Sequence, residues 1–187
     1  PDIARNVSPA VMSYHGIQYQ SMAPEVMDSA QLAWLQSHLW ILSGLYGCAR
    51  PFHAVEPYRL EMGAKLAVDD ACDLYAFWDD KLARAIAPAG SNTTIVNLAS
   101  VEYAKAVLPH LAGDITTVTC LFGEGVCNGK PIQRSTASKK ARGSMVRWMA
   151  ENKLEDASGL TAFDVGYRHA PELSNKNTLV FLNEQTL

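Results

Sequence analysis

The chain has 187 residues, a mass of 20.4 kDa and a formal net charge of −3, with 48% hydrophobic and 19% charged residues. This balance is that of an ordinary globular domain, and it excludes a disordered, collagen-like or coiled-coil protein. The slightly negative net charge also excludes a globally basic nucleic-acid binder, so any surface for nucleic acid has to be local.

The sequence offers no signal for a membrane, a metal or a cofactor. Its most apolar stretch, residues 32–45, contains polar residues and is too short to span a bilayer. The first residues lack the apolar core of a signal peptide, and the four cysteines show no C-x-x-C spacing. The five histidines are scattered, and the common phosphate- and zinc-binding motifs are missing. We therefore expect a cytoplasmic protein with free thiols, no metal site, no cofactor and no membrane contact.

The first half of the chain predicts short elements. Residues 10–14 are expected to form a strand, 24–40 an amphipathic helix and 40–43 a buried strand. Glycines and prolines punctuate residues 44–63, which predicts a long loop, and long ordered loops are usually functional. Asp73 is expected to begin a helix that ends at Ala87, before a proline.

The second half predicts longer strands and one long helix. The expected elements are a strand at 93–98, a short helix from an N-cap at Ser100 to 108, a strand at 115–122, a turn at 123–129 with a return at 131–134, a helix at 135–152 and a strand at 179–182. Strands interspersed with helices predict an α/β, mixed α+β fold, with a mixed sheet flanked by helices in a single domain over residues 1–187.

The most informative local signal is the placement of charge. Six of the 16 basic residues lie between Glu124 and Glu151, with no acidic residue among them. The chain is therefore strongly polarised, although its overall charge is small.

On a helical wheel, Lys139, Lys140, Arg142 and Arg147 form a basic arc opposite the apolar side chains. Gly143 lies within this arc, and a glycine inside a helix suggests that another group approaches its backbone. Lysines in the first turn are unfavourable beside the positive end of the helix dipole. Both features fit an anion bound at the start of this helix, assisted by nearby serine and threonine hydroxyls. The alternative is a solvated amphipathic helix whose cations only keep the protein soluble.

A second group of polar residues lies in the loop and after the strand at 93–98. Arg59 and Glu61 alternate, which would place both on one face of an extended segment, where they could share a ligand or form a salt bridge. Asn97 and Ser100 close the strand, and ligands gather at the carboxyl ends of strands in α/β sheets.

Six stretches of the sequence resemble the YaaA family of bacterial peroxide-stress proteins. They are Leu42-Ser-Gly-Leu-Tyr-Gly47, Arg50-Pro51, Pro57-Tyr-Arg-Leu-Glu-Met-Gly63, Asp73-Leu-Tyr75 with Phe77-Trp78, Asn97-Leu-Ala-Ser100 with Glu102-Tyr103, and Lys139-Lys-Ala-Arg-Gly143 followed by Glu151-Asn152. They occur in the family's order and spacing, and they extend from about Val11 to Phe181.

The resemblance implies a bacterial cytoplasmic protein that helps cells survive hydrogen peroxide by limiting free iron and oxidative DNA damage. It also implies DNA binding and an α/β fold of unusual topology with a basic cleft, without an established catalytic activity. Family members begin with a segment that has no match here. We therefore expect part of the family fold, with its helix-hairpin-helix DNA-binding element, to lie outside this chain.

Two functions are predicted. The first is weakly sequence-specific DNA binding through phosphate contacts. The second is an enzyme acting on a small phosphorylated or anionic substrate in the same cleft, with Glu61 and Tyr103 as catalytic candidates and Glu61 as the general base. Direct iron binding ranks last, since no cluster of metal ligands is evident. The candidate anion-binding residues are Arg50, Arg59, Asn97, Ser100, Lys139, Lys140, Arg142, Gly143 and Arg147.

Overall fold

The computed structural model describes residues 7–186, which divide into two compact units. Within this range, the first unit takes residues 7–14, 35–93 and 99–115, and the second takes 15–34, 94–98 and 116–186. The chain therefore passes between the units several times, and each unit has a core of its own.

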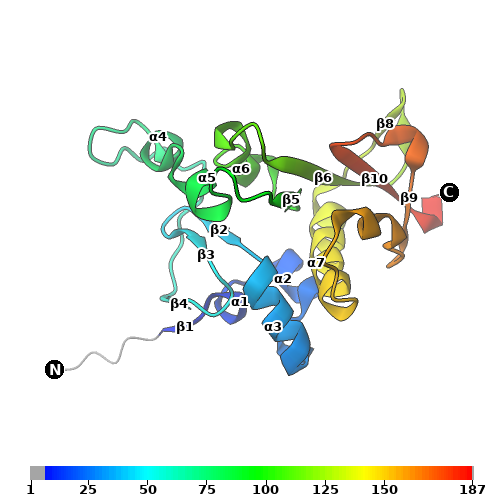
Figure 1. The fold of residues 1–187 in the computed structure, drawn as a ribbon, viewed down its shortest axis with the longest axis horizontal. Coiled ribbons are helices and arrows are strands. Elements are labelled where there is room, and N and C mark those ends of the chain that lie inside the picture. The colour runs from blue at the N-terminus through cyan, green and yellow to red at the C-terminus, as the bar shows by residue number, and fades with distance from the viewer. Residues whose placement is uncertain (1–6, 187) are drawn as a thin grey trace. The chain divides into compact units, whose positions relative to one another are not determined.

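The second unit is built on a four-stranded mixed sheet with the order β5-β6-β10-β9 (Figure 1). Strands β5 (Thr94–Asn97), β6 (Thr116–Gly123) and β10 (Thr178–Asn183) are parallel, and β9 (Tyr167–His169) runs antiparallel to β10. The predicted α/β class with a mixed sheet is confirmed. Strand β9 was not predicted, because three residues are too few to show a periodicity.

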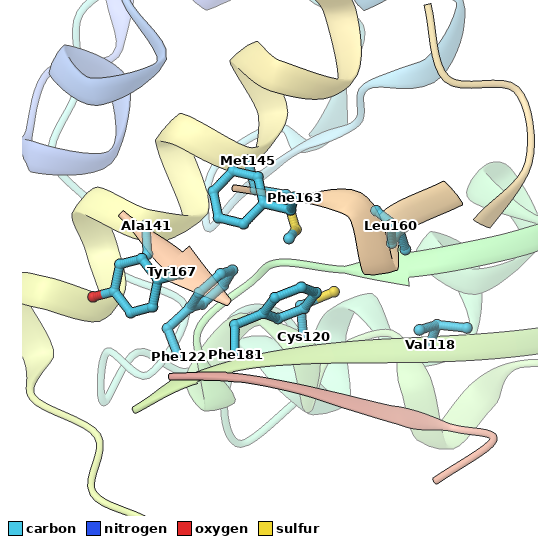
Figure 2. Packing of buried hydrophobic residues seen from close by; sticks show 9 residues of the cluster. All are labelled: Val118, Cys120, Phe122, Ala141, Met145, Leu160, Phe163, Tyr167 and Phe181. Atoms are coloured by element: carbon cyan, nitrogen blue, oxygen red, sulfur yellow. The ribbon is translucent and has the colours of Figure 1, made fainter. Parts of the chain in front are cut away.

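Helix α7 (Ser135–Glu151) packs against this sheet, and α2 (Ile17–Met22) packs against α7. Ala141 and Met145 of α7 are buried against a cluster of aromatic rings, as Figure 2 shows. The rings of Phe122 and Phe181 stack with centroids 5.5 Å apart, and Phe163 meets Phe181 edge-on at 5.8 Å. Such buried aromatic side chains dominate the hydrophobic stabilisation of a core this small.

A short β-hairpin precedes α7, and its first strand lies at residues 126–127, inside the segment 123–129 that was predicted to be a single turn. Its strands are joined by Asn128 and Gly129, whose φ angles are +50° and +72°. Two consecutive positive φ angles are typical of a type I′ turn, for which Asn-Gly is the favoured sequence. The unit's other elements are η1 (Pro24–Val26), β7 (Val126–Cys127), β8 (Lys130–Pro131), η3 (Ala157–Ala162), η4 (Pro171–Leu173) and η5 (Glu184–Thr186), while α3 (Ser29–His38) contributes to both units.

The first unit consists of short helices and two-stranded sheets around a core that includes Met62, Leu74 and Leu82. Strand β2 pairs with β3, and β1 pairs with β4, both antiparallel. The elements are β1 (Ser8–Pro9), α1 (Ala10–Ser13), β2 (Ile41–Ser43), β3 (Gly47–Ala49), β4 (Ala54–Val55), α4 (Leu74–Trp78), α5 (Lys81–Ile86), α6 (Val101–Ala104) and η2 (Leu108–His110).

Two predicted elements of the first unit are wrong in part. Residues 10–14 contain the helix α1 rather than a strand; the Tyr14 N–H donates to the Ala10 carbonyl, which closes the helical turn. The single helix expected at 73–87 is two helices, because Asp79 adopts a φ of +43° between them. Asp73 does begin the first of these, and its carboxylate accepts the Ala76 N–H at 2.8 Å.

Candidate functional site

The basic helix predicted from the sequence is α7, and its first turns carry exposed cations. Lys139 and Lys140 are both exposed, and neither forms an ion pair with a described residue. The N-cap residue, Arg134, offers no capping side chain to the first amides. Ser138 is buried and donates to the Phe122 carbonyl, so its hydroxyl braces the sheet instead of the helix start.

Arg142 is the unusual cation of α7. Its side chain is half-buried, and its Nε atom is buried without a hydrogen-bond acceptor among residues 7–186. Burial lowers the pKa of this guanidinium, and no neighbouring carboxylate offsets the effect. A desolvated charge is costly unless an opposite charge compensates it. The Arg142 guanidinium is therefore half-buried without an opposite charge from the described chain.

Arg147 differs from the other three cations because it already has a partner. Its Nε donates to Glu151 Oε1 at 2.7 Å, one helical turn further along. One of the four predicted cations of α7 is thus compensated within the helix, and the other three, which lie nearer its start, have no ion-pair partner in the described chain.

Gly143 does mark a close approach, but the approaching group is protein. A Cβ atom on Gly143 would lie 2.0 Å from the Gln18 carbonyl oxygen of α2 and 3.0 Å from the Met22 amide nitrogen. The predicted role of Gly143 in anion binding is therefore corrected: its backbone is covered by α2, and the glycine is required for helix packing.

In the first unit, Arg50 braces the end of α3. Its guanidinium donates to the Ser37 carbonyl at 3.0 Å and lies 3.8 Å from the centre of the Trp40 ring. Burial lowers the pKa of Arg50, and no carboxylate forms an ion pair with it in the described part of the chain. The arginine keeps an uncompensated positive charge in a fixed position.

The side chains of segment 57–63 alternate between the interior of the first unit and its surface, and close packing holds the segment in place. Tyr58 and Met62 point into the unit, and Met62 is fully buried. Gly44 packs so closely on this segment that a Cβ atom there would lie 2.7 Å from the Leu60 carbonyl oxygen. Arg59 and Glu61 both lie on the exposed face, as predicted, and no ion pair between them is formed.

A group of hydroxyls that the sequence analysis missed anchors this segment. The fully buried Ser43 hydroxyl hydrogen-bonds to the Tyr58 hydroxyl and accepts the Tyr46 N–H at 2.9 Å. Tyr58 in turn lies 3.0 Å from the Tyr14 hydroxyl oxygen. Burial raises the pKa of Tyr14 well above its usual range, with the neighbouring phenols adding to the effect. The only sequence signal was a serine between apolar strand residues.

Helix α6 presents the other catalytic candidate. Ser100 occupies the N-cap position but forms no side-chain cap, and its carbonyl accepts the Ala104 N–H. Burial is the main cause that raises the pKa of Tyr103. The negative charges of Glu102 and, to a smaller degree, Glu61 raise it further. The charge of Glu61 thus acts weakly on Tyr103 within the first unit.

The predicted site residues are divided between the two units. Asn97 ends β5 in the second unit, where its Nδ2 atom donates to Thr119 Oγ1 at 3.2 Å. The second unit also holds the four cations of α7. The first unit holds Arg50, Arg59, Glu61, Ser100 and Tyr103.

Residues 7–186 contain no group of three or more histidine, cysteine or acidic side chains arranged to hold a metal ion. Over the same range, no helix has the length and apolar character needed to cross a bilayer.

The two units, one with a basic helix on a mixed sheet and one rich in tyrosines and short elements, define a mixed α/β protein. A family model described as "Peroxide stress protein YaaA" matches residues 2–173. The chain belongs to this family of peroxide stress proteins, as the sequence motifs predicted.

Relatives of similar sequence carry the name UPF0246 protein. The one from Pediococcus pentosaceus is 45% identical over 185 residues, which cover 98% of this chain and 72% of the relative. Those from Lactiplantibacillus plantarum and Lacticaseibacillus casei are 43% and 46% identical over 182 residues, again covering 97% of this chain and 72% of each relative. This chain thus corresponds to somewhat less than three quarters of each relative's length.

Proposed function

We propose that this protein contributes to peroxide-stress protection in the bacterial cytoplasm by binding DNA through phosphate contacts from α7. Membership of the peroxide stress family supplies the context. The residues that carry the binding are Lys139, Lys140 and Arg142, joined by the exposed Lys130 and Arg134 of the preceding segment.

The half-buried and uncompensated Arg142 is the observation that supports this function best. Three cations occur within four residues at the start of a 17-residue helix, and no carboxylate neutralises them in the described chain. A DNA phosphate would provide the opposite charge that the half-buried Arg142 guanidinium does not receive from the described chain. Contacts of this kind read no sequence, so binding is weakly specific.

Binding to the DNA phosphates would also reduce oxidative damage to the DNA. A protein that neutralises DNA phosphates releases the cations condensed on them. Ferrous iron held near the backbone would be released in the same way, so that radicals formed from peroxide arise further from the bases. The protective effect therefore requires no iron site in the protein.

Fluorescence anisotropy with a labelled 20-base-pair duplex over a salt series tests this proposal. The plot of log Kobs against log[salt] has a negative slope. The variant Lys139→Ala/Lys140→Ala/Arg142→Ala is expected to make this slope shallower by about 2.7, that is, by about 0.9 per lost contact. The control Lys65→Ala/Lys81→Ala/Arg84→Ala removes the same charge from the first unit and is expected to keep the slope. No binding by the native protein at low salt, or equal slopes in both variants, would refute DNA binding through α7.

A second candidate function is an enzyme that acts on a small phosphorylated or anionic substrate. The charge of Glu61, which acts weakly on Tyr103, and the exposed Arg59 support it. Glu61 would act as general base, a contribution of roughly 10²–10⁴ in rate. Release of inorganic phosphate from a panel of phosphate monoesters tests the idea: turnover that Glu61→Gln abolishes supports it, and no turnover by the native protein excludes it for this substrate class.

A further inference from the structure

An open cavity of about 370 Å³ lies at the surface of the first unit, where the β2–β3 hairpin meets β4, and His53 and Ala54 in its lining are exposed. Its volume falls within the range of small-molecule sites, which is roughly 300–1,000 Å³. Its polar lining comes from Tyr46, Cys48 and His53, and its apolar lining from Ala49, Ala54 and Val55. No carboxylate lines it.

Two of the polar side chains each accept one backbone N–H and keep a donor that no described residue accepts. The Tyr46 hydroxyl oxygen accepts the Glu56 N–H at 3.0 Å, and its own proton has no acceptor among the described residues. His53 Nδ1 accepts the Arg50 N–H at 3.3 Å, so the neutral ring carries its proton on Nε2. Within residues 7–186, Nε2 has no partner.

The third polar group, the Cys48 thiol, is also a hydrogen-bond donor, and the positive charge of Arg50 acts on it. Burial raises the pKa of the Cys48 thiol, which keeps its proton, while the charge of Arg50 acts on it in the opposite sense. The Arg50 guanidinium is fixed by carbonyl oxygens and by the Trp40 ring, without an ion-pair partner in the described chain. The cavity is therefore lined by O–H, N–H and S–H donors, and the charge of Arg50, which does not itself line the cavity, acts on the Cys48 thiol.

We propose that this cavity binds the phosphate group of a small phosphate monoester. The terminal oxygens of a phosphate accept hydrogen bonds, so they suit the donors that Tyr46 and His53 keep. The apolar alanine and valine side chains would contact the organic part of the ligand. The proposal goes beyond DNA binding by α7, because it concerns a different unit, different residues and a small molecule.

Isothermal titration of the native protein with inorganic phosphate and with ribose 5-phosphate tests the cavity. Saturable binding of one ligand per chain is expected, and it should be tighter for the monoester. Tyr46→Phe keeps the shape of the ring and removes one donor, so the Kd should rise about tenfold or more, as expected for the loss of a hydrogen bond to a charged group. His53→Ala should weaken binding to a similar degree.

Tyr75→Phe is the matched control, because the Tyr75 hydroxyl donates to the Glu102 carbonyl and does not line the cavity. It should leave the Kd unchanged, as should Lys139→Ala/Lys140→Ala in α7. The proposal is overturned if the native protein binds neither ligand, or if the α7 variant loses binding while Tyr46→Phe and His53→Ala retain it. Phosphate binding without DNA binding would leave this proposal standing and remove the proposed function.

Discussion

Gly143 of α7 and Gln18 of α2 are in closer contact than any side chain on Gly143 would permit, since a Cβ atom would lie 2.0 Å from the Gln18 carbonyl oxygen. The two helices therefore pack backbone against backbone, which fixes the face of α7 that is turned away from solvent. This contact also decides which of the α7 cations remain available, because Lys139 and Lys140 are exposed while Gly143 is covered.

Gly143→Ala is expected to destabilise the protein by about 3 kcal/mol, the upper end of the usual overpacking cost, because backbone cannot yield as a flexible side chain can. Urea unfolding measures the change. Gly113→Ala is the control, since a Cβ atom there meets nothing within 4 Å. It should leave the free energy of unfolding unchanged or raise it by less than about 1 kcal/mol. Equal effects of the two substitutions would contradict the close packing of α2 on α7.

Asp73 and Asp80 offer a matched pair of helix N-caps in the first unit. The Asp73 carboxylate accepts the Ala76 N–H, whereas Asp80 forms no side-chain cap and instead pairs with Arg84 on the surface. Asp73→Ala should lower the free energy of unfolding by about 1 kcal/mol, and Asp80→Ala by less than about 0.5 kcal/mol. Thermal unfolding followed by circular dichroism distinguishes them, and a larger loss from Asp80→Ala would be inconsistent with the capping described here.

The tyrosines make the fold sensitive to alkaline pH. The pKa values of Tyr14 and Tyr167 are raised in the folded protein, chiefly by burial and then by their hydrogen-bonded neighbours. Above pH ~10 the unfolded chain loses these protons while the folded protein keeps them, so stability is fully present below that pH and falls as the pH rises. Tyr14→Phe and Tyr167→Phe should each flatten this fall. Urea unfolding between pH 9 and 11 measures it, and unaltered pH profiles in both variants would contradict the raised pKa values.

Removing the partner of Arg147 should strengthen DNA binding. Glu151 holds the Arg147 guanidinium at 2.7 Å, and Glu151→Gln leaves that charge free for a phosphate. The slope of log Kobs against log[salt] should then become steeper by up to about 0.9. Asp164→Asn, which changes the same charge at an exposed position of the second unit outside α7, should leave the slope unchanged. A shallower slope for Glu151→Gln would mean that Arg147 does not face the DNA.

Much of the second unit could be predicted because its signals are long and regular. Strand β6 alternates buried and more exposed residues over its length, and α7 shows a full amphipathic pattern. The first unit was harder. Its helix α1 depends on amide hydrogen bonds from Ala10 and Val11 to the carbonyls of His53 and Pro51, some forty residues away in the chain. Local propensity cannot show such partners.

The candidate site was predictable in composition but not in detail. Counting charges along the sequence identified Lys139, Lys140 and Arg142, because a run of basic residues without an acidic one can be recognised from the sequence alone. The covering of Gly143 by α2 and the burial of Ser43 beneath Tyr58 depend on tertiary packing. The contacts that distinguish the arginines, Arg50 with the Trp40 ring and Arg147 with the Glu151 carboxylate, likewise become visible only in the folded structure.

The central claim is that Arg142 is an uncompensated cation kept for DNA phosphate, and Arg142→Met tests it most directly. Methionine keeps the apolar stem and removes the desolvated charge, so the free energy of unfolding should stay the same or rise, as is often found when buried charges become apolar. In the same variant, the affinity for duplex DNA at low salt should fall several-fold. A variant that is less stable and binds DNA as tightly as the native protein would show that Arg142 is structural, and the account would be wrong.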